Sequence, residues 1–212
     1  MNKSQRIQQF FTVLKAANPN PQTELEYTSV FELLAAVLLS AQATDVSVNK
    51  ATRRLFPVAN TPQALIDLGE ERLCDYIRTI GLYRSKARHL LQTCEMVLRE
   101  HQGVVPRQRE ALEQLPGVGR KTANVVLNVA FGEPTLAVDT HVFRLGNRTG
   151  FAPGSTPLEV EQAWLKAIPA DFLHDAHHWL ILHGRYVCTA RSPQCGACQV
   201  NAFCDFQDKT PA

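Results

Sequence analysis

The stretch Leu115-Pro116-Gly117-Val118-Gly119-Arg120-Lys121-Thr122-Ala123 places a tight glycine turn directly before residues that favour a helix. Glycines at 117 and 119 allow positive φ and close approach of the backbone to a ligand. Because a helix N-terminus presents N–H groups with partial positive charge, the turn and the helix can bind one phosphate oxygen together. The stretch predicts a hairpin between two helices that contacts a DNA backbone through Gly117, Val118, Gly119 and Arg120. A helix corner that needs glycine for steric reasons alone is the alternative.

Apolar residues recur at helical spacing along most of the chain, beginning with the i, i+3, i+4, i+7 pattern within residues 7–14. Ser29 and Thr156 each precede a glutamate by three residues, which predicts helix starts near 30 and 157. Residues 124–131 could be read as a buried strand, but their length and helix-start context favour a helix. The sequence therefore predicts an all-α protein. Further helices are expected near 45–56, 62–68, 70–79, 85–101, 107–114, 120–131, 140–148 and 171–184.

The composition is that of a globular protein, because 45% of the 212 residues are hydrophobic and 20% are charged. The formal net charge is only +2, so any binding to nucleic acid has to come from locally arranged cations. The longest apolar run, 31–39, contains Glu32 and is about half of the roughly 20 residues that a membrane span needs. Residues 1–11 lack the apolar run of a secretion signal. We expect an intracellular protein without a membrane segment.

Proline and glycine clusters at 18–21 and 132–134 give the strongest boundary signals. We therefore expect two lobes. The first is a central helical domain over 23–134 that contains the hairpin. The second combines the two ends of the chain, 1–22 and 135–212.

Lys121 and Asp139 form a minimal set for covalent chemistry on a sugar. Asp139 lies 18 residues after Lys121, a separation over which the chain can fold back. A lysine amine attacks only when it is neutral, so its surroundings have to activate it, and a carboxylate can take up a proton or stabilise positive charge on the sugar. By local pattern alone, the commoner roles are a phosphate-binding cation for Lys121 and a helix N-cap for Asp139.

Four of the six cysteines crowd into residues 188–204 with the spacing C-x6-C-x2-C-x5-C. This uneven layout favours a metal site over disulfides, because Cys74 and Cys94 stand alone in helical patterns. Zinc is the metal most often bound by four cysteines. Structural zinc sites commonly use two closely spaced cysteine pairs, however, and only one C-x-x-C pair occurs here. The spacing favours an iron-sulfur cluster, and four thiolates suit the [4Fe-4S] type. The expected ligands are Cys188, Cys195, Cys198 and Cys204.

Taken together, four features resemble the endonuclease III family of helix-hairpin-helix DNA glycosylases: residues 115–128, 137–144, Ser40-Ala41-Gln42-Ala43-Thr44-Asp45 and the cysteine spacing. The likeness covers nearly the whole chain in order. It implies a two-lobed glycosylase fold with a C-terminal [4Fe-4S] loop. It also implies an enzyme of base excision repair that excises oxidised pyrimidines from duplex DNA and nicks the strand by β-elimination. In that family the lysine matching Lys121 attacks C1′ of the damaged nucleotide, and Asp139 matches the catalytic aspartate.

The resemblance also assigns residues to the opening of the duplex. A glycosylase swings its target nucleotide out of the stack, and a side chain then fills the hole. Gln42 and Leu82 match the inserting residues of the family. From the pattern alone, Leu82 would be a hydrophobic contact after a helix-ending glycine, and Gln42 an ordinary polar residue near a helix end. The cluster loop is expected to hold Arg191 where it can meet phosphate.

By this resemblance the partner is duplex DNA with damaged pyrimidines or abasic sites. We expect a monomer in the bacterial cytoplasm, associated with the nucleoid through DNA. Two rival functions are open. The first is a DNA-binding module without catalysis. The second is a monofunctional adenine glycosylase, although that relative lacks a lysine at the position of Lys121.

Overall fold

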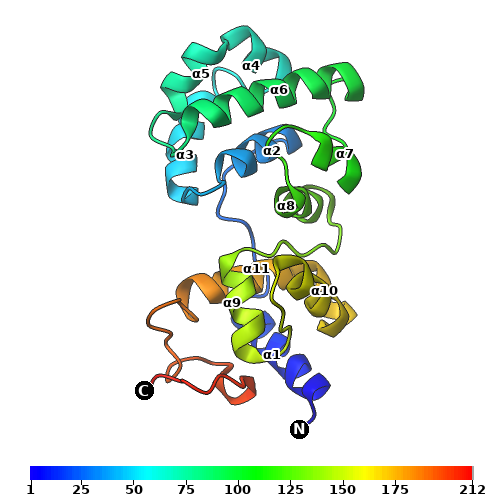
Figure 1. Ribbon diagram of the computed structural model, residues 1–212, viewed down its shortest axis with the longest axis vertical. Helices are drawn as coiled ribbons and strands as arrows, with labels where there is room; N and C mark the ends of the chain where they lie inside the picture. The colour runs from blue at the N-terminus through cyan, green and yellow to red at the C-terminus, as the bar shows by residue number, and fades with distance from the viewer. Residues whose placement is uncertain (212) are drawn as a thin grey trace. The chain divides into compact units, whose positions relative to one another are not determined.

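The computed structural model describes residues 1–211, and it confirms the all-α prediction because no strand occurs in that range (Figure 1). Each helix expected from the sequence is present, with its ends within two residues of the prediction. The helices are α1 (Lys3–Ala17), α2 (Val30–Leu39), α3 (Asp45–Leu55), α4 (Pro62–Leu68), α5 (Glu70–Ile77), α6 (Tyr83–His101), α7 (Arg109–Gln114), α8 (Arg120–Phe131), α9 (Thr140–Thr149), α10 (Pro157–Ala167), α11 (Ala170–Tyr186) and the short 3-10 helix η1 (Asn201–Phe203).

The predicted helix starts are made by side-chain caps. The Ser29 hydroxyl accepts the backbone N–H of Glu32 at 3.1 Å, and α2 begins at the next residue. The Thr156 hydroxyl accepts the N–H of Glu159 at 3.2 Å at the start of α10. Each cap satisfies one of the N–H groups that a helix leaves unpaired in its first turn. The segment 124–131, which could have been a strand, lies within α8.

The chain forms two compact units. The central unit consists of residues 23–132 and contains α2 to α8. The terminal unit combines residues 1–22 with the chain from 133 onward and contains α1, α9 to α11 and η1. Gly132 ends α8 with φ 68°, a left-handed conformation that suits glycine, and the chain passes there from one unit to the other. Residue 212, included in the expected second domain, lies outside the described residues.

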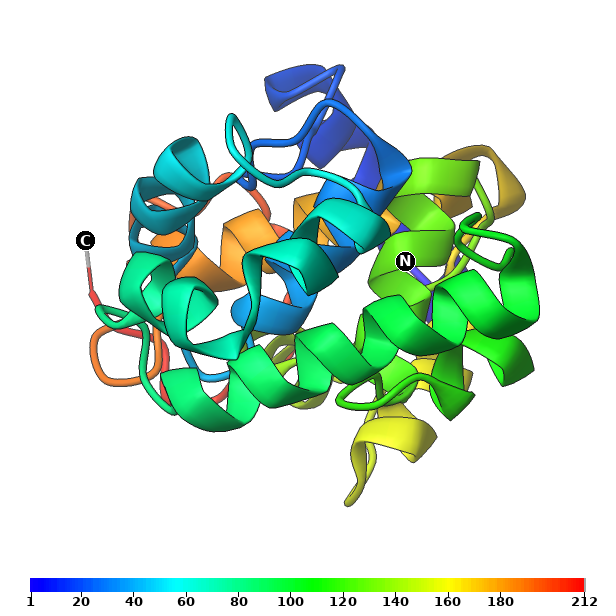
Figure 2. The ribbon, with the colours of Figure 1, turned by 90° about the horizontal axis from the view of Figure 1, so that it is seen from above.

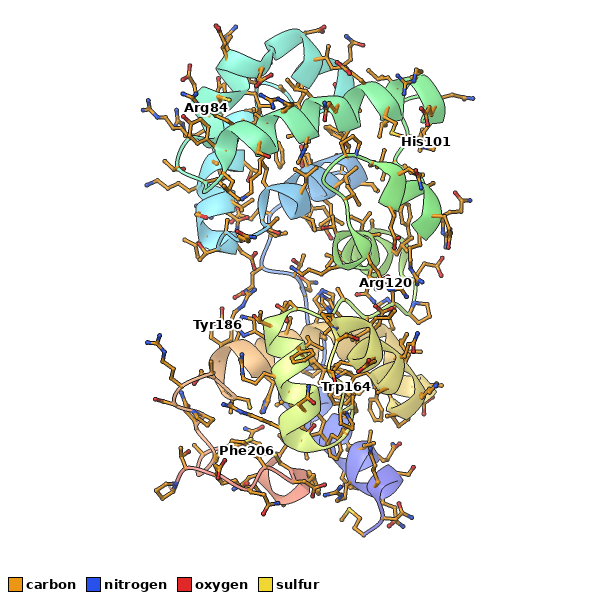
Figure 3. The ribbon with its side chains drawn as sticks, in the orientation of Figure 1. Arg84, His101, Arg120, Trp164, Tyr186 and Phe206 are labelled. Atoms are coloured by element: carbon orange, nitrogen blue, oxygen red, sulfur yellow. The ribbon has the colours of Figure 1, made fainter. Side chains whose placement is uncertain are left out.

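In the central unit, α2 forms the buried middle. All of its residues from Phe31 to Leu39 are buried, as its almost unbroken apolar sequence predicts. The long helix α6 packs on α4 and α5 along one side and on α2 along another (Figures 1 and 2). Figure 3 labels Arg84 near the start of α6 and His101 at its end. Because α6 spans the unit, it can connect parts that lie far apart in the sequence.

The terminal unit is built around an aromatic core. The ring of Phe11 stacks on Phe172 with centroids 5.7 Å apart and meets Trp164 edge-on at 6.0 Å. Trp164, labelled in Figure 3, is fully buried. A Cβ atom at Gly146 would lie 2.7 Å from the carbonyl oxygen of Ala152, so only glycine fits at this position of α9. This packing fixes α9, which carries part of the candidate site.

Candidate functional site

The glycine turn joins α7 to α8, as the sequence predicts. Gly117 has φ 78°, and the N–H of Val118 closes the turn on the carbonyl of Leu115 at 3.0 Å. Gly119 does not use the positive φ that glycine allows, because its φ is −94° and its ψ is 177°, an extended conformation that any residue adopts. A Cβ atom at Gly119 would meet nothing within 4 Å. Neither the backbone angle nor the packing of this structure therefore requires glycine at position 119.

The first turn of α8 combines an uncapped N-terminus with cations. Gly119 is the N-cap of α8 and provides no side-chain acceptor for the helix N–H groups. Arg120, labelled in Figure 3, and Lys121 are the first two residues of the helix, and both side chains are exposed. Residues 122–128 are buried, so the helix is anchored behind them. The turn and the two cations together form a site suited to binding a phosphate, and the amine of Lys121 is exposed beside it.

The hairpin rests on α6. The Thr93 hydroxyl donates to the carbonyl of Pro116 at 2.9 Å, and Thr93 is fully buried. A Cβ atom at Gly117 would lie 3.1 Å from the Cβ of His89, so the turn packs closely on that side chain. Sequence reasoning missed both supports. The polar Thr93 within an apolar helical pattern was the available signal.

Gln42 and Leu82 share an unusual backbone conformation. Their φ angles are 55° and 59°, in the left-handed region that is uncommon for residues other than glycine. Leu82 lies before α6 and is 65% exposed. The interpretation of Leu82 as a hydrophobic contact that ends a helix is therefore wrong. Gln42 is also exposed, in the turn that links α2 to α3. Strained and exposed residues of this kind are frequent at functional positions.

Asp139 is the N-cap of α9, as its local pattern predicts. Its Oδ1 atom accepts the backbone N–H groups of His141 and Val142, both at 2.9 Å. The second oxygen, Oδ2, makes no hydrogen bond within residues 1–211. The cap thus orients the carboxylate and leaves Oδ2 without a hydrogen bond to the helix. Asp139 belongs to the terminal unit, whereas Lys121 belongs to the central unit.

The four clustered cysteines line one pocket. All four are free thiols, so the disulfide alternative is wrong. Four thiols around one pocket are a donor set that suits an iron-sulfur cluster. The pocket is lined by Cys188, Cys195, Cys198 and Cys204 together with apolar side chains such as Phe10, Leu145 and Val200.

Several donors already face the sulfur atoms. The backbone N–H of Phe206 donates to the Sγ of Cys204 at 3.5 Å, and an Nη atom of Arg148 donates to the Sγ of Cys188 at 3.5 Å. Burial raises the pKa of the Cys204 thiol, so the proton has to be displaced when a metal binds. Donors of this kind stabilise thiolates and tune a cluster. The donor set therefore fits an iron-sulfur group.

Arg191 lies exposed in the loop between the first two cysteines. Arg148 of α9 holds this loop by donating to the carbonyls of Thr189 and Ala190 at 2.6 and 2.8 Å. The guanidinium of Arg148 also lies 4.8 Å from the ring centroid of Phe206, the C-terminal label in Figure 3. Arg191 thus lies in a loop that contains two of the clustered cysteines at its ends and that Arg148 holds by hydrogen bonds. Sequence reasoning missed this role of Arg148.

The histidines of α11 are core residues rather than a separate metal site. His177, His178 and His183 are all buried. Burial lowers the pKa of His183 to about 4, so the imidazole is neutral at pH 7. Its Nε2 atom lies 3.6 Å from the Sγ of Cys198, which places it beside the cysteine pocket.

Comparisons with known proteins agree with this geometry. Residues 35–170 match the family described as HhH-GPD superfamily base excision DNA repair protein, and residues 188–204 match the iron-sulfur binding domain of endonuclease III. The chain is thus a base excision DNA repair protein of the HhH-GPD superfamily with an iron-sulfur segment at residues 188–204.

The relatives define the family more closely. Endonuclease III of Escherichia coli strain K12 is 60% identical over 99% of both chains, and that of Haemophilus influenzae is 59% identical over 99% of both. A solved structure of a trapped covalent endonuclease III–DNA intermediate has a TM-score of 0.90 at 47% identity and covers 97% of each chain. A thermostable thymine-DNA glycosylase, at 23% identity and a TM-score of 0.83, shares the fold. The chain belongs to the endonuclease III family, which carries a [4Fe-4S] cluster.

Proposed function

We propose that Lys121 is the nucleophile and Asp139 the acidic partner of a DNA glycosylase and abasic-site lyase that excises oxidised pyrimidines. The enzyme class follows from membership of the endonuclease III family, and duplex DNA is the partner. The observation that carries the residue assignment is the exposed Lys121 in the first turn of α8, directly after the phosphate-type turn at Gly117. A backbone phosphate bound at this turn would bring the adjoining sugar to the amine.

The proposed reaction proceeds in successive steps, and each step forms one bond as another breaks. The neutral amine of Lys121 forms a bond to C1′ while the bond from C1′ to the base breaks and its electron pair leaves with the base. After the amine loses its proton, the sugar ring opens to a Schiff base. Removal of a C2′ proton then expels the 3′ phosphate by β-elimination, and water releases the lysine. The Asp139 carboxylate would stabilise positive charge on the sugar during the first step and accept a proton.

Gln42 and Leu82 would fill the hole that the flipped nucleotide leaves. Their left-handed backbone and their exposure support this role, because the side chains project from loops instead of packing in the core. Extrusion of a nucleotide costs a few kcal/mol, which an inserted side chain partly offsets by replacing lost stacking. During this step the DNA strand would be held by the hairpin. The turn would contribute backbone groups of Gly117, Val118 and Gly119, and Arg120 would contribute its cation.

Cys188, Cys195, Cys198 and Cys204 would ligate the [4Fe-4S] cluster. When bound, the cluster supplies metal-thiolate bonds that fold a segment with little apolar core of its own. Base removal transfers no electron, so the loop's contribution to the reaction is to place Arg191, with Arg185 upstream, against phosphate. The loss of these cations would weaken binding to DNA of any sequence.

The endonuclease III proteins of Escherichia coli and Haemophilus influenzae are bacterial, which supports action on chromosomal DNA in the cytoplasm. Among residues 1–211 no helix combines the length and the apolar character required to cross a membrane. A monomer is sufficient for the proposed chemistry, because one chain supplies every residue that we assign.

A pair of variants tests the assignment of the nucleophile. Lys121→Gln should lose both base excision and strand cleavage while binding to duplex DNA remains, and Lys166→Gln, which removes an exposed lysine of α10, should retain both activities. Excision is measured as alkali-labile sites and cleavage as nicks formed without alkali. Excision retained by Lys121→Gln would contradict the assignment and favour a monofunctional glycosylase. Absence of both activities in the intact protein would favour a binding module.

A further inference from the structure

The central unit contains a buried lysine that the proposed chemistry does not use. Lys86 on α6 is only 5% exposed. Burial lowers the pKa of its ammonium, and no charged side chain among residues 1–211 offsets this effect. A buried charge without an ionic partner is costly, and a methionine of similar length would fill the same space without that penalty. The presence of Lys86 therefore points to a task for the ammonium.

The Lys86 side chain joins the end of α2 to the first turns of α6. Its Nζ atom donates to the carbonyl of Leu39 at 2.9 Å, and Leu39 is the last residue of α2. The backbone N–H of Lys86 donates to the carbonyl of Leu82 at 3.0 Å, which is the helix's own first-turn bond and fixes Leu82 to α6. Gln42 follows Leu39 by three residues, so the Lys86 ammonium joins the segment before Gln42 to the helix that begins after Leu82.

The same face of α6 also supports the hairpin. Positions 86, 89 and 93 follow each other at intervals of three and four, which places them along one side of α6, and Leu82 is the residue directly before the helix. His89 packs against Gly117, and Thr93 donates to the carbonyl of Pro116. One side of α6 thus contacts the end of α2 and the phosphate-type turn, and the helix begins directly after Leu82.

We propose that Lys86 is a positioning residue that keeps the Gln42 and Leu82 loops in register, so that both side chains enter the duplex together. This inference rests on the proposed insertion of Gln42 and Leu82. No backbone N–H within residues 1–211 reaches the Leu39 carbonyl from outside α2, and a cation is favoured at a helix C-terminus. Without the ammonium, the end of α2 would be free to shift relative to α6.

The test compares two substrates under single-turnover conditions. Lys86→Met should lower excision of an oxidised pyrimidine from duplex DNA by about tenfold or more, because small misplacements of positioning groups have effects of that order. Its cleavage of an abasic site in single-stranded DNA should stay within about twofold of the intact protein, because an unstacked nucleotide needs no wedge. A 2-aminopurine base beside the lesion should report reduced opening of the duplex. Lys166→Met is the matched control and should change neither substrate.

A double mutant tests the coupling. In a Leu82→Ala background, Lys86→Met should produce little further loss, because residues that act together are not additive. Equal losses on duplex and single-stranded substrates, or additive losses in the double mutant, would overturn the proposal. If Lys86→Met does not fold by circular dichroism, Lys86→Gln, which removes the charge and shortens the reach of the donor, is compared on the same two substrates and should show a smaller loss confined to the duplex. Failure of the intact protein to cleave the single-stranded abasic substrate would instead count against the proposed lyase itself.

Discussion

The Asp139 carboxylate accepts the backbone N–H of Val142 at 2.9 Å through Oδ1, the same oxygen that accepts the N–H of His141. One oxygen of this carboxylate therefore begins α9, and the other is not used by the helix. The two interpretations that the sequence left open, a helix cap and a catalytic acid, are compatible because they use different oxygens. The contribution of each can be separated by substitution.

Asp139→Asn should slow base excision strongly while the unfolding temperature changes little. Asparagine caps helices about as well as aspartate, so the substitution removes the charge and keeps the acceptor. Asp139→Ala should slow excision and also lower the stability by about 1 kcal/mol through loss of the cap. Single-turnover excision and thermal unfolding measure the two effects. An unchanged excision rate in Asp139→Asn would leave the residue as a helix cap only.

The two glycines of the turn should respond differently to alanine. Gly117→Ala forces a side chain into φ 78° and against His89, so it should destabilise the protein by about 1 kcal/mol or more. Gly119→Ala should change stability by no more than about 0.5 kcal/mol, because its backbone is extended and its surroundings are open. If phosphate approaches this backbone, Gly119→Ala should still weaken DNA binding. Equal stability losses in the two variants would argue against this account of the turn.

Leu82→Gly should reduce excision from duplex DNA without destabilising the fold. Leu82 is 65% exposed and has φ 59°, a conformation that glycine adopts without a steric penalty. Val104→Ala, which truncates another exposed apolar residue of the same unit, provides the control and should leave excision unchanged. Thermal unfolding and single-turnover excision decide the matter. A marked fall in unfolding temperature for Leu82→Gly would show that the Leu82 side chain packs within the protein and is not free to insert into DNA.

Cys204→Ser should lose iron and the visible absorption of the cluster, and the segment 188–211 should become sensitive to proteases. The reason is that metal-thiolate bonds from all four cysteines would hold the turns of this segment, which has no regular helix longer than the three residues of η1. Cys74→Ser, a substitution of a half-buried cysteine in the central unit, should keep its iron. Iron analysis with limited proteolysis measures both variants. Full iron content in Cys204→Ser would remove this residue from the ligand set.

Helix positions could be predicted from the sequence because caps such as Ser29 and Thr156 act through neighbouring residues. The cysteine pocket was predictable for the same reason, since its spacing lies within one short segment. Contacts between distant segments were not predictable. The bond from Lys86 to Leu39 joins residues 47 positions apart, and neither residue has a local pattern that indicates it. The φ of Gly119 could not be predicted, because a glycine is compatible with both extended and left-handed conformations.

Borohydride trapping on duplex DNA that contains an oxidised pyrimidine tests the central assignment most directly. Borohydride reduces a Schiff base between a lysine and the opened sugar to a stable amine, so a covalent protein–DNA complex reports the intermediate itself. The account predicts a trapped complex with the intact protein and with Lys166→Gln, and none with Lys121→Gln. A complex that persists in Lys121→Gln, or the absence of any complex with the intact protein, would contradict it.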